Sequence, residues 1–395
     1  MKTLKVTLQT VTPMFLGGAD PRGEPELRAA SVRGALRFWL RALLGGALGD
    51  RNLDALRRAE NEVFGSTDTG ASPVVVRLKE LSGSSTLTKA SFSALAEWDG
   101  KSRVYRKPGI AYLFFAARGT RRESERKAIQ GKFQLILNAR PGAQAEEAFK
   151  RAYAALWLLT RLGGLGARSR RGAGSLQVVQ VKGDVPSGLP ALPIRATSPE
   201  ELQEELAEGL HALRQLVGDA GNVSNPSAFD VLHPNACKIW IINKIFSSGE
   251  EALDKFGQSM QRFRNRRNPD YSNVKNAIQG GQLKQPVERA AFGLPIVFYY
   301  RSLGGQSATL EGETHERRAS PLMIRVTRLS TGKYVIVLTL FQAVLLPDGS
   351  LELIKEVQGR RLSLGQCSIP GMGLIYDFLN DVDRQVAPRL EVTGW

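Results

Sequence analysis

The sequence has few of the side chains on which metal and nucleophilic catalysis depend. Its 395 residues include only two cysteines and three histidines. Cys237 and Cys367 stand far apart, which excludes a disulfide framework and a cysteine-based zinc cluster. No His-Glu-x-x-His, His-Asp or Gly-Gly-Asp-Asp stretch occurs, so metal-dependent nuclease and cyclase activities lack candidate residues. We therefore expect a protein without a metal, a cofactor or a catalytic centre.

Long apolar runs are also absent. The longest apolar stretch, 334–346, is interrupted by Thr339 and Gln342 and is too short to cross a bilayer. Residues 1–16 lack the apolar centre of a signal peptide. With 42% hydrophobic residues the chain is long enough to bury two or three cores. We expect a globular cytoplasmic protein that does not contact membranes.

Acidic residues are scarce in the first half of the chain. Residues 1–197 contain 32 Lys and Arg against 16 Asp and Glu, whereas residues 198–395 contain 22 of each. The whole net charge of +16 therefore lies in the first half. Arg outnumbers Lys there by 22 to 10, which favours planar, bidentate contacts to phosphate. A solvated basic face would have the same composition, but this asymmetry favours a polyanionic partner.

A glycine-rich, arginine-rich stretch extends from Gly163 to Ser175. Its glycines allow positive φ and close backbone approach, and its arginines supply fixed positive charge, a combination suited to a phosphate chain. It follows a helix and precedes a strand, and no Gly-Lys-Ser/Thr closes it, which excludes the common nucleotide-binding loops. A basic, flexible surface turn explains the loop in isolation equally well. The candidate phosphate-binding residues are Gly163, Gly164, Gly166, Arg168, Arg170, Arg171, Gly172, Gly174 and Ser175.

A second basic element precedes it. Ser31 is expected to cap a helix that continues to about residue 44, with an apolar stripe from Val32 to Leu43. Its arginines recur at intervals of four and share one flank, which favours an anion among them, although solvated arginines would give the same pattern. The candidate residues are Arg28, Arg33, Arg37 and Arg41.

The hydrophobic pattern of the first half predicts a β-α-β-β-α-β order. Strands are expected at 5–12, 73–81, 132–138 and 176–181, with helices at 31–44 and 146–162. This is the split ferredoxin-like order that RNA-recognition folds also use. The aromatic signature of an ordinary RNA-recognition motif is missing, so binding by base stacking on the sheet is not expected. Residues 103–117 are predicted to be irregular and extended.

The second half is less regular. Helices are predicted at 199–217 and 250–264, and a strand buried on both faces at 238–245. Further strands are predicted at 295–301, 322–329 and 334–341. Residues 374–386 are a candidate for one more helix.

Several of these stretches resemble the RAMP superfamily. The similarity is carried by Thr12-Pro-Met-Phe-Leu-Gly-Gly-Ala, by Glu26 through Arg41, by the Gly163 loop, and by Phe292-Gly-Leu-Pro-Ile and Arg317-Arg-Ala-Ser-Pro-Leu. More narrowly, the chain resembles the large, first-numbered subunit at the head end of the Cmr complex, the type III-B CRISPR effector. The resemblance implies an α+β fold of two tandem ferredoxin-like (RRM-like) RAMP domains with helical insertions. The expected boundaries are 1–185 and 226–395, with a helical linker at 186–225.

The resemblance also implies a function. It points to a non-catalytic subunit that caps the effector near the 3′ end of the crRNA and holds guide or target RNA in antiviral defence. Its partners would be single-stranded RNA, either crRNA or target RNA, and the other RAMP subunits of the effector. Arg317 and Arg318 join the candidate RNA-binding residues on this basis.

Two alternatives stay open. Some RAMP proteins cut repeat RNA without a metal by using a histidine and basic neighbours, and His315 is the candidate for such a role. The chain could instead be a purely structural assembly subunit, with its neutral second half as the protein-facing side. Phe292, Pro295 and residues 317–322 would then shape that side, although core packing explains Phe292 and Pro295 equally well.

Overall fold

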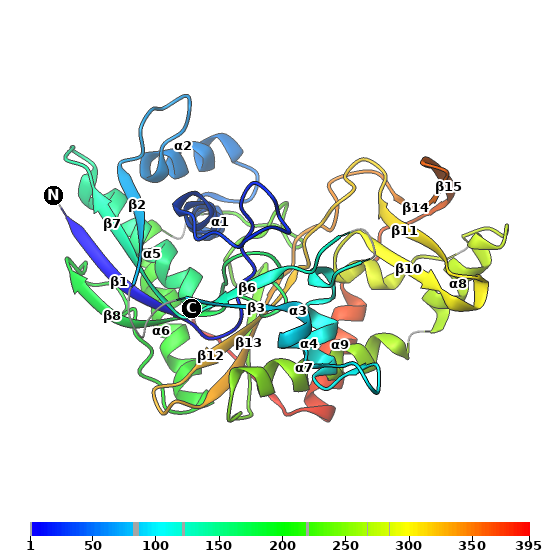
Figure 1. The fold of residues 1–395 in the computed structure, drawn as a ribbon. Coiled ribbons are helices and arrows are strands. Elements are labelled where there is room, and N and C mark those ends of the chain that lie inside the picture. The colour runs from blue at the N-terminus through cyan, green and yellow to red at the C-terminus, as the bar shows by residue number, and fades with distance from the viewer. Residues whose placement is uncertain (1, 82–86, 121–122, 219–220, 267, 284) are drawn as a thin grey trace.

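The computed structural model describes residues 2–81, 87–120, 123–218, 221–266, 268–283 and 285–395. These residues form two four-stranded antiparallel sheets with the same strand order and a third four-stranded sheet that extends to one side (Figure 1). Helices separate and cover the first two sheets. The fold is α+β, as the sequence predicts.

The first sheet has the ferredoxin-like order. Its strands are β1 (Thr3–Thr10), β2 (Val74–Glu80), β7 (Lys132–Ala139) and β8 (Leu176–Gly183), and they lie in the order β2-β7-β1-β8. The first strand in sequence therefore lies between the third and the fourth. Helices α1 (Ala29–Leu48) and α5 (Ala145–Arg161) connect these strands, and α2 (Leu53–Phe64) follows α1. The predicted β-α-β-β-α-β order is confirmed.

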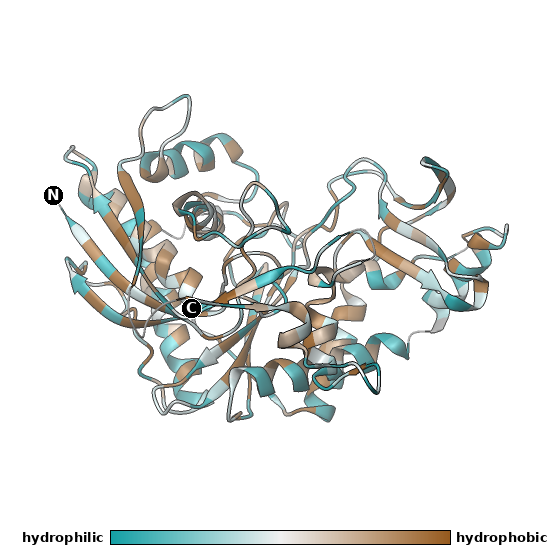
Figure 2. Cartoon of the chain, viewed as in Figure 1, coloured by the Kyte–Doolittle hydropathy of each residue, from teal (hydrophilic) through white to brown (hydrophobic). Residues whose placement is uncertain are grey.

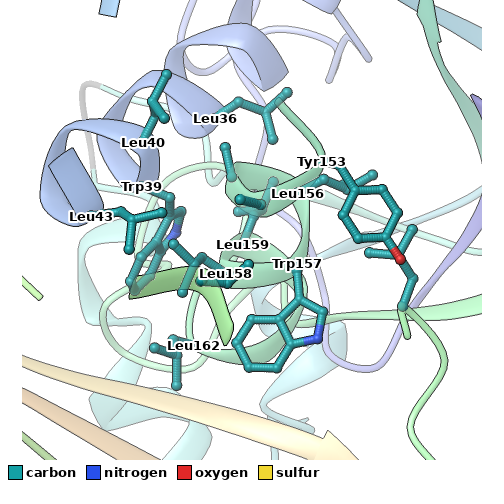
Figure 3. Packing of buried hydrophobic residues seen from close by; sticks show 14 of the residues in the cluster. Leu36, Trp39, Leu40, Leu43, Tyr153, Leu156, Trp157, Leu158, Leu159 and Leu162 are labelled. Atoms are coloured by element: carbon teal, nitrogen blue, oxygen red, sulfur yellow. The ribbon is translucent and has the colours of Figure 1, made fainter. Parts of the chain in front are cut away.

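The core of this domain forms between the sheet and the pair α1 and α5. Apolar residues at alternate positions of β1 are fully buried, and they face the apolar stripes of both helices. Figure 3 shows Trp39 and Leu43 of α1 next to Leu158 and Leu159 of α5. The two helices therefore hold fixed positions, and so does the loop that follows α5.

The second sheet repeats the ferredoxin-like order. Its strands are β9 (Cys237–Ile242), β12 (Leu322–Arg328), β13 (Tyr334–Phe341) and β16 (Arg389–Glu391), and they lie in the order β12-β13-β9-β16. Its connecting helices are α7 (Gly249–Asn265) and α9 (Gly373–Gln385). Ile239 and Ile241 join the core of the first domain, whereas Trp240 and Ile242 pack in the core that contains α7 and α9. The prediction of a strand buried on both faces is confirmed.

Insertions extend both domains. Between β2 and β7 the chain forms β3 (Thr88–Ser91), α3 (Phe92–Leu95), β4 (Trp98–Asp99), β5 (Val104–Tyr105), α4 (Pro108–Leu113) and β6 (Lys127–Gln130). The third sheet, at the right of Figure 1, contains β10 (Ile296–Tyr300), β11 (Gln306–Gly312), β14 (Leu351–Val357) and β15 (Arg360–Cys367), with α8 (Asn268–Ile278) beside it. Helix α6 (Pro199–Val217) contacts both α1 and β9 and so connects the two domains.

Two local predictions are wrong. Helix α1 begins at Ala29 with Arg28 as its N-cap, so Ser31 lies inside the helix and does not cap it. Residues 108–113 form helix α4, because Pro108 is tolerated in a first helical turn. The predicted strand at 295–301 is confirmed as β10, which belongs to the third sheet. The helix predicted near 374–386 is confirmed as α9.

No helix in the described part of the chain is both long enough and apolar enough to cross a bilayer.

The crossing of α4 and α7 generates a stability prediction. A Cβ at Gly109 would lie 1.9 Å from the carbonyl oxygen of Asp254, whereas a Cβ at Gly34 in α1 would meet nothing within 4 Å. Gly109→Ala should lower the free energy of unfolding by roughly 1 to 3 kcal/mol because the helices must separate. Gly34→Ala should raise it by about 0.5 to 1 kcal/mol through helix propensity. Urea unfolding measures both, and equal effects would contradict the tight crossing.

Candidate nucleic-acid interface

The glycine-rich loop folds back on itself between the two domains. The Leu165 amide donates to the carbonyl oxygen of Gly174 at 2.9 Å, and the Gly174 amide donates to that of Pro13 at 2.8 Å. Gly174 has φ 65°, and a Cβ there would lie 1.9 Å from the Leu165 carbonyl oxygen. Only glycine fits this position.

Several amides of the loop are already used within the protein. The Ala167 amide donates to the Phe15 carbonyl oxygen, and the Arg171 amide donates to that of Arg168. The Ser175 amide donates to Oγ1 of Thr12. The Ala167 and Ser175 amides hold the loop against the segment that follows β1, and the Arg171 amide closes a turn within the loop.

The three loop arginines point their guanidinium groups into the protein. Nε of Arg168 donates to the carbonyl oxygen of Leu113 in α4 at 2.9 Å. Nη2 of Arg171 donates to the carbonyl oxygen of Phe292 at 2.8 Å, and Arg171 is 9% exposed. Burial lowers the pKa of Arg168 to about 10; burial, together with nearby arginines, lowers the pKa of Arg171 to about 9. Both side chains remain charged at neutral pH.

The third loop arginine forms a triad with a buried carboxylate. Arg170 and Arg318 both donate to Asp230, at 2.6 and 2.7 Å, and the Arg170 guanidinium lies over the Phe38 ring. Burial alone would raise the pKa of Asp230, but the two arginines outweigh it and hold that pKa below its ordinary value. The structure thus brings together two predicted site residues that are far apart in sequence. Asp230 gave no sequence signal, because it is a lone acid in a loop.

Arg325 in β12 is the residue that sequence analysis missed most clearly. It is 1% exposed, and it donates to the carbonyl oxygens of Gly163 and Leu176 at the two ends of the glycine-rich loop. Burial, and to a lesser extent the charge of Arg161, lowers the pKa of Arg325 to about 9. An arginine directly between the apolar residues Ile324 and Val326 of a strand was the available signal.

The arginines of α1 divide into two groups. Arg37 and Arg41 both donate to the carboxylate of Glu60 in α2. Burial would raise the pKa of Glu60, but these two arginines lower it. Arg28 and Arg33 are exposed and have no ion-pair partner in the described part of the chain. They present positive charge to solvent.

The predicted site is therefore only partly assembled at the surface. Arg28, Arg33 and Arg317 are exposed, and Arg41 is half-exposed beside its carboxylate partner. Arg170 and Arg171 bind oxygens of the second domain, Arg318 shares Asp230 with Arg170, and Arg168 binds Leu113 within the first domain. RNA contact at any of these residues stays a prediction.

The histidines do not form a site with one another. Nε2 of His315 lies 3.5 Å from a carboxylate oxygen of Asp348, and both side chains are exposed. His211 contacts Gln215 in α6, and His233 accepts from the Asn235 amide. Among the residues that the structure describes, no group of three or more His, Cys, Asp or Glu could hold a metal ion.

The Asp230 triad generates a pH-dependent prediction. Asp230→Asn should lower the free energy of unfolding at pH 7 by about 3 kcal/mol, because it leaves two arginines without their buried partner. The folded-state pKa of Asp230 lies below its unfolded value. The stabilisation is therefore complete above the unfolded pKa of about 3.9 and is lost as the pH falls through the folded value.

Urea unfolding of wild type and variant between neutral and acidic pH tests this. The control is Asp68→Asn, which removes the exposed partner of Arg57 and should change stability little. A wild-type advantage over Asp230→Asn that grew toward acidic pH would contradict the prediction.

The chain is similar in sequence to proteins of a known family. The family model of the RAMP superfamily matches residues 7–177. The CRISPR system Cmr subunit Cmr1-2 of Pyrococcus furiosus is 36% identical over 188 residues, which cover 44% of this chain and 94% of that protein. The Cmr1-1 subunit of the same organism is 27% identical over 398 residues, which cover 98% of this chain and 97% of that protein.

Solved structures show the same fold. The crystal structure of Cmr1 from Pyrococcus furiosus in its apo form has a TM-score of 0.63 at 23% identity and covers all of both chains. A chain of the type III-B Cmr-beta complex bound to cognate target RNA has a TM-score of 0.55 at 12% identity, and the match covers 98% of this chain and 99% of that chain. The chain thus belongs to the RAMP superfamily and is a homologue of the Cmr1 subunits of the type III-B Cmr complex.

Proposed function

We propose that the protein is a non-catalytic RNA-binding subunit of a type III-B CRISPR effector. It would cap the complex near the 3′ end of the crRNA and hold guide or target RNA for antiviral defence. The observation that carries the proposal is the similarity to Cmr1-1, which extends over almost the whole of both chains. Cmr-beta in its solved structure is bound to cognate target RNA, which supports RNA and other Cmr subunits as partners.

The charge of the chain supports an RNA ligand. The excess of arginine is confined to the half that contains the first ferredoxin-like domain. Arg28 and Arg33 lie at the start of α1 with no described carboxylate to neutralise them. Such residues contact phosphates and are blind to base sequence, which suits an effector that leaves recognition to base pairing.

The glycine-rich loop packs against α1, the helix that carries the exposed Arg28 and Arg33. Arg170 packs on Phe38 of α1 and pairs with Asp230, so the loop fixes the helix that carries the exposed arginines. The proposed phosphate contacts are therefore made chiefly by Arg28 and Arg33, and Arg41 and Arg317 are further exposed cations. Replacing Arg168, Arg170 and Arg171 would chiefly test folding, because their guanidinium groups bind protein carbonyl and carboxylate oxygens.

Salt-dependent RNA binding tests the proposal. We expect the wild-type protein to bind single-stranded RNA with an affinity that falls steeply as salt rises. Arg28→Gln/Arg33→Gln should weaken binding and reduce the log-log salt slope by roughly 1.4, because each phosphate that is no longer bound lowers it by about 0.7. Fluorescence anisotropy with a labelled RNA of mixed sequence across a salt series measures both quantities.

The control is a double variant that removes the same number of positive charges as Arg28→Gln/Arg33→Gln. Lys255→Gln/Arg360→Gln removes two exposed cations from the second half of the chain, one in α7 and one in β15. It should keep the wild-type slope. Wild-type protein that bound no RNA, or a slope reduced equally in both variants, would count against the proposed contacts.

A cleavage assay tests the absence of catalysis. His315 has Asp348 beside it at an exposed site in the third-sheet region, away from the arginines of α1. We expect wild type and His315→Ala to leave a labelled CRISPR repeat RNA intact to the same degree. Cleavage by wild type that His315→Ala abolished, with RNA binding retained, would assign the protein to the processing ribonucleases.

A further inference from the structure

The first sheet has one face that no described helix covers. Helices α1 and α5 pack on the other face, as Figure 1 shows. The strands alternate between hydrophobic and hydrophilic residues along their length (Figure 2). Residues at alternate positions of a strand share a face. The apolar residues therefore face the helices, and the polar residues face solvent.

The strand register brings the cations of this outer face together. Lys5 of β1 lies directly opposite Lys182 of β8 on one side and Ile136 of β7 on the other. Ile136 in turn lies opposite Arg77 of β2. One row across the four strands thus carries three cations, two of them direct neighbours. Like charges directly opposite each other on adjacent strands destabilise a sheet unless an anion lies between them.

The neighbouring rows continue the pattern. Thr7 lies between Gln180 and Gln134, and Gln134 lies opposite Lys79. In the next row Lys132 lies opposite Gln9. We call this surface the sheet face, and its cations are Lys5, Arg77, Lys79, Lys132 and Lys182.

The charge of the sheet face is not neutralised within the protein. No ion-pair partner is found for any of its five cations in the part of the chain that the structure describes. Its strand residues include no carboxylate. Glu80 lies opposite Phe133 and so belongs to the other side of β2. Asp184, just beyond β8, accepts the Thr3 amide.

We propose that the sheet face is a second RNA surface, which binds the phosphate backbone of single-stranded RNA independently of its sequence. This inference rests on the proposed function and adds a separate contact area to it. Charge complementarity identifies a polyanion as the ligand. Cations and amide side chains outnumber the apolar residues Val75 and Ile136 in the paired rows of this face, unlike in the core of a protein interface, which favours RNA over an acidic protein. It presents no aromatic side chain, so base stacking is not involved.

The sheet face and the start of α1 lie on different sides of the first domain. Helix α1 packs its apolar stripe on the inner face of the sheet, and Arg28 and Arg33 are exposed at its N-terminal end. The two surfaces can therefore be altered independently. RNA that contacted both would extend around the edge of the domain.

The test compares two quadruple variants of the full chain with equal charge. The first is Lys5→Gln/Arg77→Gln/Lys79→Gln/Lys182→Gln. The control is Lys255→Gln/Arg301→Gln/Lys333→Gln/Arg360→Gln, which removes four exposed cations from the second half. With labelled single-stranded RNA across a salt series, we expect the sheet-face variant to bind at least about tenfold more weakly at low salt and to reduce the salt slope by roughly 2 to 3. The control should stay close to wild type.

The outcomes separate this inference from the proposed function. A sheet-face variant that binds RNA as the control does overturns the inference, while the Arg28/Arg33 variant still decides the proposed function. Retention on poly-L-glutamate that only the sheet-face variant abolishes, with RNA binding unchanged, would assign the face to an acidic protein and also overturn the inference. The melting temperature should not fall in the sheet-face variant, because it removes only exposed charges and a like-charge pair. Its weaker RNA binding can then be attributed to the altered surface and not to unfolding.

Discussion

The structure depends on buried arginines that bind backbone carbonyl oxygens across the junction of the two domains. Arg325 of the second domain donates to Gly163 and Leu176 of the first, and Arg171 of the first donates to Phe292 of the second. A guanidinium group has five donors and no acceptor, so its burial is tolerable only where several oxygens converge. The glycine-rich loop supplies such oxygens because its backbone is folded tightly enough to turn carbonyl groups inward. The docking of the domains and the conformation of the loop therefore require each other.

This constraint changes the role of the glycine-rich loop. Glycines and arginines in one loop suggest a phosphate-binding site, since free amides and fixed positive charge bind anions. Here the glycines permit close approach of one strand of the loop to the other, as Gly174 does with Leu165. The three loop arginines donate to the carbonyl oxygens of Leu113 in α4, of Phe292 and of Ser320. The loop helps to determine where α1 and its exposed arginines lie, so we expect its contribution to a ligand to be indirect.

The sequence predicted the two sheets well, because the features that define them are local. Alternation of apolar residues in β1, β7 and β9 and the stripes of α1 and α5 are visible within a few residues, and the ferredoxin-like order follows from the order of the elements. The third sheet was missed because β11, β14 and β15 carry weaker alternation, with partly exposed residues on both faces. The sequence indicated which arginines were candidate binding residues, but it did not indicate the protein groups with which they pair. Asp230 lies 60 residues from Arg170, and nothing in the local sequence indicates whether a guanidinium group faces solvent or a buried carboxylate.

The same limit explains why the sheet face could not be found from charge runs. Its five cations lie on four strands, with one or two on each, among glutamine and threonine neighbours that resemble any polar strand face. They form a group only through the strand register, which places Lys5 beside Lys182 across 177 positions of sequence. The conspicuous arginines of α1 and the loop are mostly paired with protein oxygens, whereas the sheet-face cations have no ion-pair partner among the residues that the structure describes. In a basic protein, the unneutralised charge identifies a polyanion surface better than the density of cations in the sequence, because a cation paired internally has little attraction left for a ligand.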